Sequence, residues 1–318
     1  MTSISLPLAL FDFWTLPTSL KPLKQISLGA LAAICALAVL WWLLRAVFPK
    51  MAAIAWTAGK EALMQPLFYM LLAFGAFTIV LLLYLPYFTF GEDTKYFEDN
   101  ALTLVMLLSI VLALWTASSS VADEIEGRTA LTVLCKPISR RDFILGKFLG
   151  ILGPVAIMFI VLGAFYLTFV SIKVVYDARE TSLPEPNSAQ CLAEVVRMAP
   201  GLLLAFMEAT VMAAISVAIS TRLGLLPNLV ICLSIYVLGN LVPTLAKSAM
   251  GQMAIVPFLA NLLAAILPVL DHFNIYGPIS TGASVPLTYL GLAGIYCLAY
   301  TALAMFVALL MIEDRDLA

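Results

Sequence analysis

Long apolar stretches separated by short polar connections run along almost the whole chain. Each stretch has about 20 residues with little charge, which is enough for a helix to cross a hydrocarbon core roughly 30 Å thick. The short alternating segments typical of a membrane β-barrel are not the pattern here. We therefore predict an all-α, polytopic helical membrane protein with seven spans, at residues 26–47, 67–89, 101–121, 148–171, 199–220, 223–245 and 287–311.

One segment between the first two predicted spans has a different pattern. Residues 50–65 are mostly apolar and helix-forming, but they include Lys60 and Glu61, and Pro66 follows. A helix that is apolar on one side and carries a few charges is typical of an element lying along the membrane interface. We predict such an interfacial helix at 50–65.

The segments on the other side of the membrane are expected to be less regular. Residues 253–270 are apolar but short and contain two prolines, which favours a re-entrant or interfacial helix over an eighth span. The polar segment from Lys173 to Glu194 and the acidic segment Gly91–Asn100 are expected to be solvated loops.

Composition agrees with a membrane protein and excludes some partners. Of 318 residues, 63% are hydrophobic and 11% are charged, a balance that a water-soluble domain of this length could not bury. The net charge of −2 and the absence of a basic stripe in the sequence argue against nucleic-acid binding. The five cysteines occur singly, without C-x-x-C spacing, and are interpreted as packing residues.

The densest cluster of Lys and Arg lies between Arg128 and Lys147, and cationic connections stay on the cytoplasmic side. This cluster follows an acidic run, Asp123, Glu124 and Glu126, in which Glu124 and Arg128 form an i,i+4 acid-to-base pair. We expect a helix there, ended by Lys136-Pro137 because proline disfavours α geometry in the preceding residue.

A second helix is predicted to begin directly after this proline. Ser139 is placed as its N-cap, Asp142 completes an S-x-x-D box, and Ile138 with Phe143 occupies the staple positions. We expect a rigid corner, exposed to the cytoplasm, whose basic side chains are Arg140, Arg141 and Lys147. Such a corner suits docking to a partner, although a plain connection between two spans has the same composition.

The stretch VADEIEGRTALTVLCKPISRRDFILGKFLG resembles the segment between the second and third core spans of ABC-2 type permeases. The matching residues are Glu124, Gly127, Arg128, Thr129, Leu134, Pro137, Ile138, Ser139, Arg140, Phe143, Ile144, Gly146 and Lys147. The stretch AGKEALMQ is similar to the elbow helix of these permeases, with Glu61 at its acidic position. The ending IEDRDL resembles that of a bacterial branch of the family.

This resemblance implies a six-span core at 49–318, preceded by an N-terminal tail and one extra span at 1–48. It implies a homo- or heterodimer of permease chains in the bacterial cytoplasmic membrane, with one ABC ATPase subunit beneath each chain. The coupling segment, residues 122–147, would include the ATPase contact, made by Asp123, Glu124, Glu126, Gly127, Arg128, Lys136, Pro137, Ile138, Ser139, Arg140, Arg141, Phe143 and Lys147.

Catalysis and cofactor binding are not expected of the chain itself. The sequence has no G-x-x-x-x-G-K-[ST] phosphate loop, so ATP and Mg would be bound by the partner ATPase. Neither a catalytic residue, nor a cofactor site, nor a metal site is predicted. An intramembrane protease is disfavoured, because Asp123-Glu124 with Arg128 would need nearby histidines, and the single histidine, His272, is predicted on the opposite side.

Two other functions stay open at this point. Glu208 lies in the middle of the span 199–220, where a carboxylate costs a few kcal/mol, so it should face the protein interior. It could bind a proton or a substrate in an ion-coupled secondary transporter, or it could be a hydrogen-bonded packing residue. A membrane assembly scaffold is the other possibility. The uniformly apolar spans lean towards a lipid-like or amphipathic cargo, and the direction of transport is undetermined.

Overall fold

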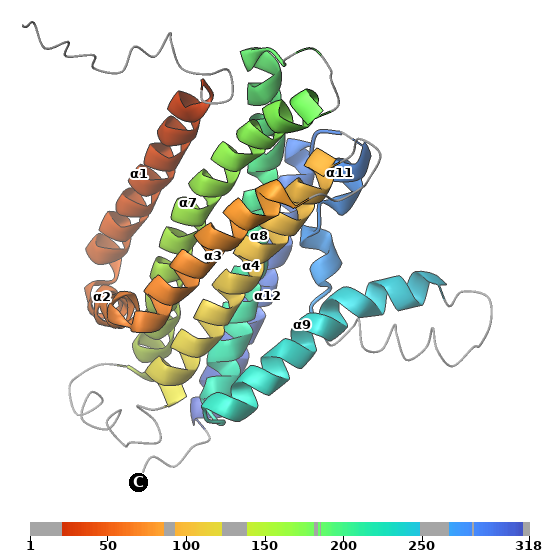
Figure 1. Cartoon of the computed structure of the whole chain (residues 1–318). Coiled ribbons are helices and arrows are strands. Elements are labelled where there is room, and N and C mark those ends of the chain that lie inside the picture. Colours follow the sequence, from red (N-terminus) through yellow and green to blue (C-terminus); the bar gives the residue numbers. More distant parts are fainter. Residues whose placement is uncertain are drawn as a thin grey trace, which may run out of the picture.

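The computed structural model describes residues 21–85, 93–122, 139–180, 184, 186–248, 267–281 and 283–313. Every regular element among these residues is a helix, and the long helices form one bundle (Figure 1). In chain order the helices are α1 (Leu23–Val47), α2 (Pro49–Met64), α3 (Pro66–Tyr84), α4 (Asp93–Ala117), the π-helix η2 (Ser118–Ala122), α7 (Arg140–Glu180), α8 (Ser188–Ser220), α9 (Leu225–Ser248), the 3-10 helix η3 (Leu270–Phe273), α11 (Tyr276–Thr281) and α12 (Leu287–Glu313).

Six of these helices are long and apolar enough to cross a membrane: α1, α3, α4 continued to Val121, α7, α8 and α12. They confirm the predicted class, a polytopic helical membrane protein. The helix α9 covers the remaining predicted span, 223–245, but its apolar part, Leu225–Leu241, is shorter than the other six. Figure 1 shows α9 leaving the bundle diagonally.

The helices α4, α7 and α8 form the centre of the bundle, where each packs against the other two. Large apolar side chains such as Leu112, Met158 and Leu204 are fully buried between them. In contrast, α1 stands at the edge, and only 6% of its apolar stretch is buried. It contacts α2 and α7, as Figure 1 shows. The predicted extra N-terminal span is therefore peripheral to the central helices.

The break between α2 and α3 lies where the sequence places it. The backbone at Gln65 is extended, and Pro66 occupies the first turn of α3, where its missing N–H leaves no hydrogen bond unmade. The helix predicted at 50–65 is therefore a separate element. Figure 1 shows it turned across the end of the bundle.

Two predicted loops are wrong, because helices extend through them. The helix α4 begins at Asp93, inside the acidic segment 91–100. Between Lys173 and Glu194 the chain is mostly helical, since α7 runs to Glu180 and α8 begins at Ser188.

Charged side chains in these extensions pair with one another, and this explains the error. The Lys173 ammonium lies 2.8 Å from the Asp177 carboxylate one turn along α7. The Arg197 guanidinium binds the buried carboxylate of Glu98 on α4 at 3.2 Å. A polar sequence can therefore remain helical, because its charges are satisfied along and between helix faces.

Candidate functional site

The predicted coupling segment, 122–147, begins and ends at one end of the bundle. At this end lie α2, η2, the start of α7 and the end of α12 (Figure 1); we call it the Ser139 end. Residues 123–138 lie outside the described residues. The structure therefore does not place Asp123, Glu124, Glu126, Gly127, Arg128, Lys136, Pro137 and Ile138.

The second half of the predicted corner has the expected cap. The Oγ atom of Ser139 accepts a hydrogen bond from the Asp142 N–H at 3.1 Å, and the Ser139 carbonyl accepts one from the Phe143 N–H at 3.1 Å. This confirms Ser139 as the N-cap. The helix α7 then continues over 41 residues, from Arg140 to Glu180. The corner and the membrane span are therefore one helix.

The basic residues of the corner have different environments. Arg140 and Arg141 are exposed. The Arg140 Nη1 atom donates to the Ile312 carbonyl at 3.2 Å, so it also holds the end of α12, where a cation complements the helix dipole. The sequence predicted that Lys147 is exposed, and this is wrong, since only 4% of its surface is accessible. Lys147 lies two turns further along α7 than Arg140, where its ammonium group bonds to Ser120 of η2.

A run of three serines on η2 connects the coupling segment to the rest of the bundle. Each serine accepts a hydrogen bond from a different part of the chain. The Ser118 Oγ atom accepts from Asn228 Nδ2 of α9, Ser119 from Gln65 Nε2 at 3.3 Å, and Ser120 from Lys147 Nζ at 2.9 Å. We call Ser118–Ser120 with these three partners the serine hub. Its π-helical geometry is of a kind that is frequent at functional sites.

Asn228 is the most connected member of the serine hub. It is fully buried, and its Nδ2 also lies within hydrogen-bond distance of Ser216 Oγ at 2.8 Å and Ser220 Oγ at 2.9 Å. Its Oδ1 accepts from Cys232 Sγ at 3.2 Å. The side chain thus joins α8, α9 and η2, and buried networks of this kind fix the relative position of their elements.

The helix α2 packs on the start of α7 through small residues. A Cβ atom added at Gly150 would lie 2.7 Å from the Ala58 Cβ and 2.8 Å from the Ala55 carbonyl oxygen. At Gly146 an added Cβ would lie 2.9 Å from the Ile54 Cβ. Glycines four residues apart let two backbones approach closely in a membrane. Lys60 and Glu61 are exposed on this helix.

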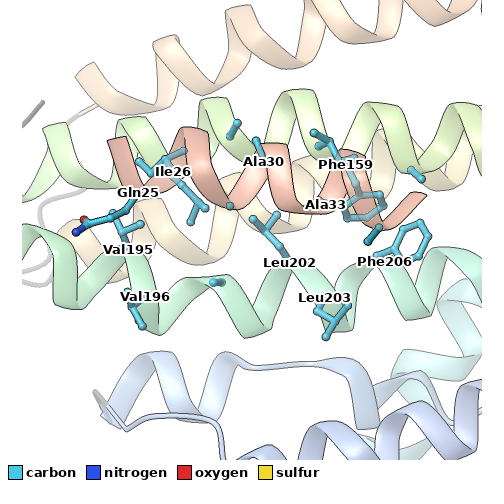
Figure 2. Close-up of a pocket in the computed structure, with 18 of the residues that line it drawn as sticks. Gln25, Ile26, Ala30, Ala33, Phe159, Val195, Val196, Leu202, Leu203 and Phe206 are labelled. Carbon is cyan, nitrogen blue, oxygen red and sulfur yellow. The ribbon is translucent and has the colours of Figure 1, made fainter. Parts of the chain in front are cut away.

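An apolar groove of about 680 Å³ lies between α1, α7 and α8. Figure 2 shows Ala30 and Ala33 of α1 facing Phe159 of α7 and Leu202 of α8 across it. Gln25, at one end, is the polar residue among those that line the groove. The helix α1 contacts α2 and α7 but does not pack closely against α8, and the groove is the space left between them.

Two further residues discussed from the sequence, the candidate Glu208 and the single histidine, lie away from the Ser139 end. Glu208 is buried in the middle of α8, with 2% of its surface accessible, and faces a second, smaller cavity. This agrees with the expectation that it faces the protein interior. His272 is exposed on η3, with its ring 5.4 Å from that of Tyr296 on α12.

The serine hub was missed by sequence reasoning. Ser118–Ser120 is visible as a run of polar residues at the end of an apolar stretch, but its partners at 65, 147 and 228 have no common pattern. Comparisons with protein-family models and with curated proteins give no match to this chain. What the fold establishes is the class, a multi-pass helical membrane protein.

Proposed function

We propose that the chain is the membrane-spanning permease subunit of an ABC transporter of the ABC-2 type. A separate ABC ATPase subunit, carrying ATP and Mg, would supply the energy, and two permease chains would form a homo- or heterodimer in the bacterial cytoplasmic membrane. The observation that supports this most strongly is the capped corner at Ser139. It presents Arg140 and Arg141 to solvent and continues without a break into a central helix.

The serine hub supplies a way to transmit force. The coupling segment leaves the bundle at η2 and returns at Ser139. A hydrogen bond from Lys147 of α7 to Ser120 of η2 connects the helix where it leaves to the helix where it returns. A push on the corner would therefore reach α7 directly and would reach α9 through Asn228 and the α2–α3 junction through Gln65. Rigid shifts of packed helices are a common way to convert a local contact into opening of a path.

The apolar groove supports the lipid-like or amphipathic cargo that the composition favours. It has a polar residue, Gln25, at one end and apolar walls over the rest (Figure 2). An acyl chain is compatible with such walls, because they are as apolar as the lipid tails of a bilayer.

Co-purification with the ATPase tests the proposal. The ATPase would be a phosphate-loop protein encoded beside this chain and expressed with it. The double substitution Arg140→Glu with Arg141→Glu should abolish its co-purification and ATPase-dependent activity. The matched control, Lys95→Glu with Arg179→Glu, makes the same charge change at the opposite end and should retain both. Retention in both double variants would contradict the docking assignment.

Glu208 and its cavity favour one alternative, an ion-coupled secondary transporter. Under that alternative, Glu208→Gln would abolish transport driven by an ion gradient, and transport would need no ATP. Under the proposed function, transport requires the ATPase whatever residue occupies 208. A membrane assembly scaffold would transport nothing under either condition.

A further inference from the structure

A second cavity lies within the bundle, where α4, α8 and α9 meet the segment Leu270–Ile275. Its volume is about 180 Å³, which holds several water molecules but is smaller than a typical site for a drug-sized ligand. Its lining is unusually polar for the interior of a membrane protein. The polar residues around it are Asp99, Thr103, Glu208, Tyr236, Asn240 and Asn274.

Glu208 is the central residue of this cavity. Its side chain is almost completely buried, and its Oε1 atom has no hydrogen-bond partner among the described residues. The Asn240 side chain is placed to hydrogen-bond with the carboxyl group. A carboxylate with an unsatisfied oxygen at this depth costs several kcal/mol unless a proton or a cation compensates it.

The charges around the cavity are one-sided. Asp99 supplies a second carboxyl group, and the described lining residues include no Lys, Arg or His. The nearby guanidinium of Arg197 is bound to Glu98 and Glu194. The cavity therefore contains two acidic groups, and no basic side chain among its described lining residues balances their charge.

On the side of the cavity opposite α4, the segment Pro268–Ile275 packs closely against α8 and α9. A Cβ atom added at Gly201 would lie 2.3 Å from the Ile275 Cδ1, so the Ile275 side chain packs directly against α8 at Gly201. An added Cβ at Gly239 would lie 2.8 Å from the Pro268 carbonyl oxygen. The Val269 N–H donates to the Tyr296 hydroxyl at 2.9 Å, which fixes this wall to α12.

We propose that this cavity is a binding site for a small monovalent cation. The cation is either an alkali-metal ion or the ammonium group of a small molecule, and Glu208 and Asp99 compensate its charge. Thr103, Asn240 and Asn274 also line the cavity and each carries a side-chain oxygen, and carboxylate and neutral oxygen groups are the ligands that hard cations prefer. This inference does not rest on the proposed coupling to an ATPase.

Thermal unfolding of the purified full-length chain in detergent tests the site. NaCl, KCl or methylammonium chloride replaces the chloride of a bulky cation, N-methylglucamine, at constant total chloride. A ligand that binds the folded state raises the unfolding midpoint saturably, by roughly 5 °C well above its dissociation constant. A response to Na⁺ or K⁺ assigns a metal ion, and a response to methylammonium assigns an ammonium group.

Three variants connect the response to the cavity. Glu208→Gln and Asp99→Asn should each remove it, whereas Glu61→Gln, which neutralises an exposed carboxylate on α2, should retain it. If the wild type responds to none of the three cations, or if Glu208→Gln and Asp99→Asn both respond as the wild type does, the proposal is wrong. A wild type without any response and a more stable Glu208→Gln would identify Glu208 as a protonated packing residue.

Discussion

The Lys147 ammonium on α7 donates a hydrogen bond to the Ser120 hydroxyl on η2, with 2.9 Å between Nζ and Oγ. These two residues lie on either side of residues 123–138, so a buried bond joins the two points at which the coupling segment meets the bundle. Lys147 also lies 5.9 Å from the centre of the Phe143 ring. Its role is therefore internal, and Arg140 and Arg141 remain as the exposed cations of the corner.

The bond between Lys147 and Ser120 should contribute measurably to stability. Ser120→Ala and Lys147→Met should each lower the free energy of unfolding by about 1–3 kcal/mol, because each removes one partner of a buried, charge-assisted hydrogen bond. A double-mutant cycle, measured by chemical unfolding in detergent, should give a coupling energy of at least about 0.5 kcal/mol. Strictly additive losses would show that the two side chains do not interact.

Asn228 should be the most sensitive polar residue of α9. Asn228→Ala removes a buried amide group whose Nδ2 lies within hydrogen-bond distance of three serine hydroxyls, and we expect a loss of about 2–3 kcal/mol in unfolding free energy. Ser234→Ala on the same helix is the control. Among the described residues, the Ser234 hydroxyl bonds only to the Val230 carbonyl of its own helix, and it is exposed, so the change should stay within about 0.5 kcal/mol. Equal effects of the two substitutions would refute the role given to Asn228.

The contact between α2 and α7 can be tested with two glycines of the same helix. Gly150→Ala would place a methyl group against Ala58 and the Ala55 carbonyl, and overpacking of this kind costs about 1–3 kcal/mol. At Gly153 an added Cβ meets nothing within 4 Å, so Gly153→Ala should be neutral or stabilising by up to about 1 kcal/mol. Thermal unfolding of both variants gives the comparison, and a harmless Gly150→Ala would mean that α2 does not pack closely on α7.

Sequence patterns predicted much of the fold, because the length of an apolar span and the residues that begin or end a helix can be recognised within a short stretch of sequence. The spans, the break at Pro66 and the cap at Ser139 all follow from residues next to one another in the chain. The helical extensions at Asp93 and Glu180 did not follow, since polar side chains in them have partners on other helices: Glu98 of α4 pairs with Arg197 of α8, and Asp177 of α7 accepts a hydrogen bond from Thr94 of α4.

The candidate sites depend more strongly on tertiary structure. Glu208 could be predicted as inward-facing from its depth alone, but its cavity also requires Asn240 of α9 and Ile275, which follow it in the chain by 32 and 67 positions. The burial of Lys147 depends on the rotation of α7 relative to η2, which no local pattern specifies. The assignment to ABC-2 permeases remains a prediction from residues around 124–147.

Site-specific photocrosslinking at position 141 tests the proposed function most directly. A photoreactive amino acid replaces Arg141 in cells that contain the whole transporter, and a second variant carries it at Arg179, at the far end of α7. We predict that irradiation links position 141, and not position 179, to a chain with a phosphate loop, identified by mass spectrometry. The absence of such an adduct at 141, with the protein folded and in the membrane, would contradict the proposal that this corner receives the ATPase.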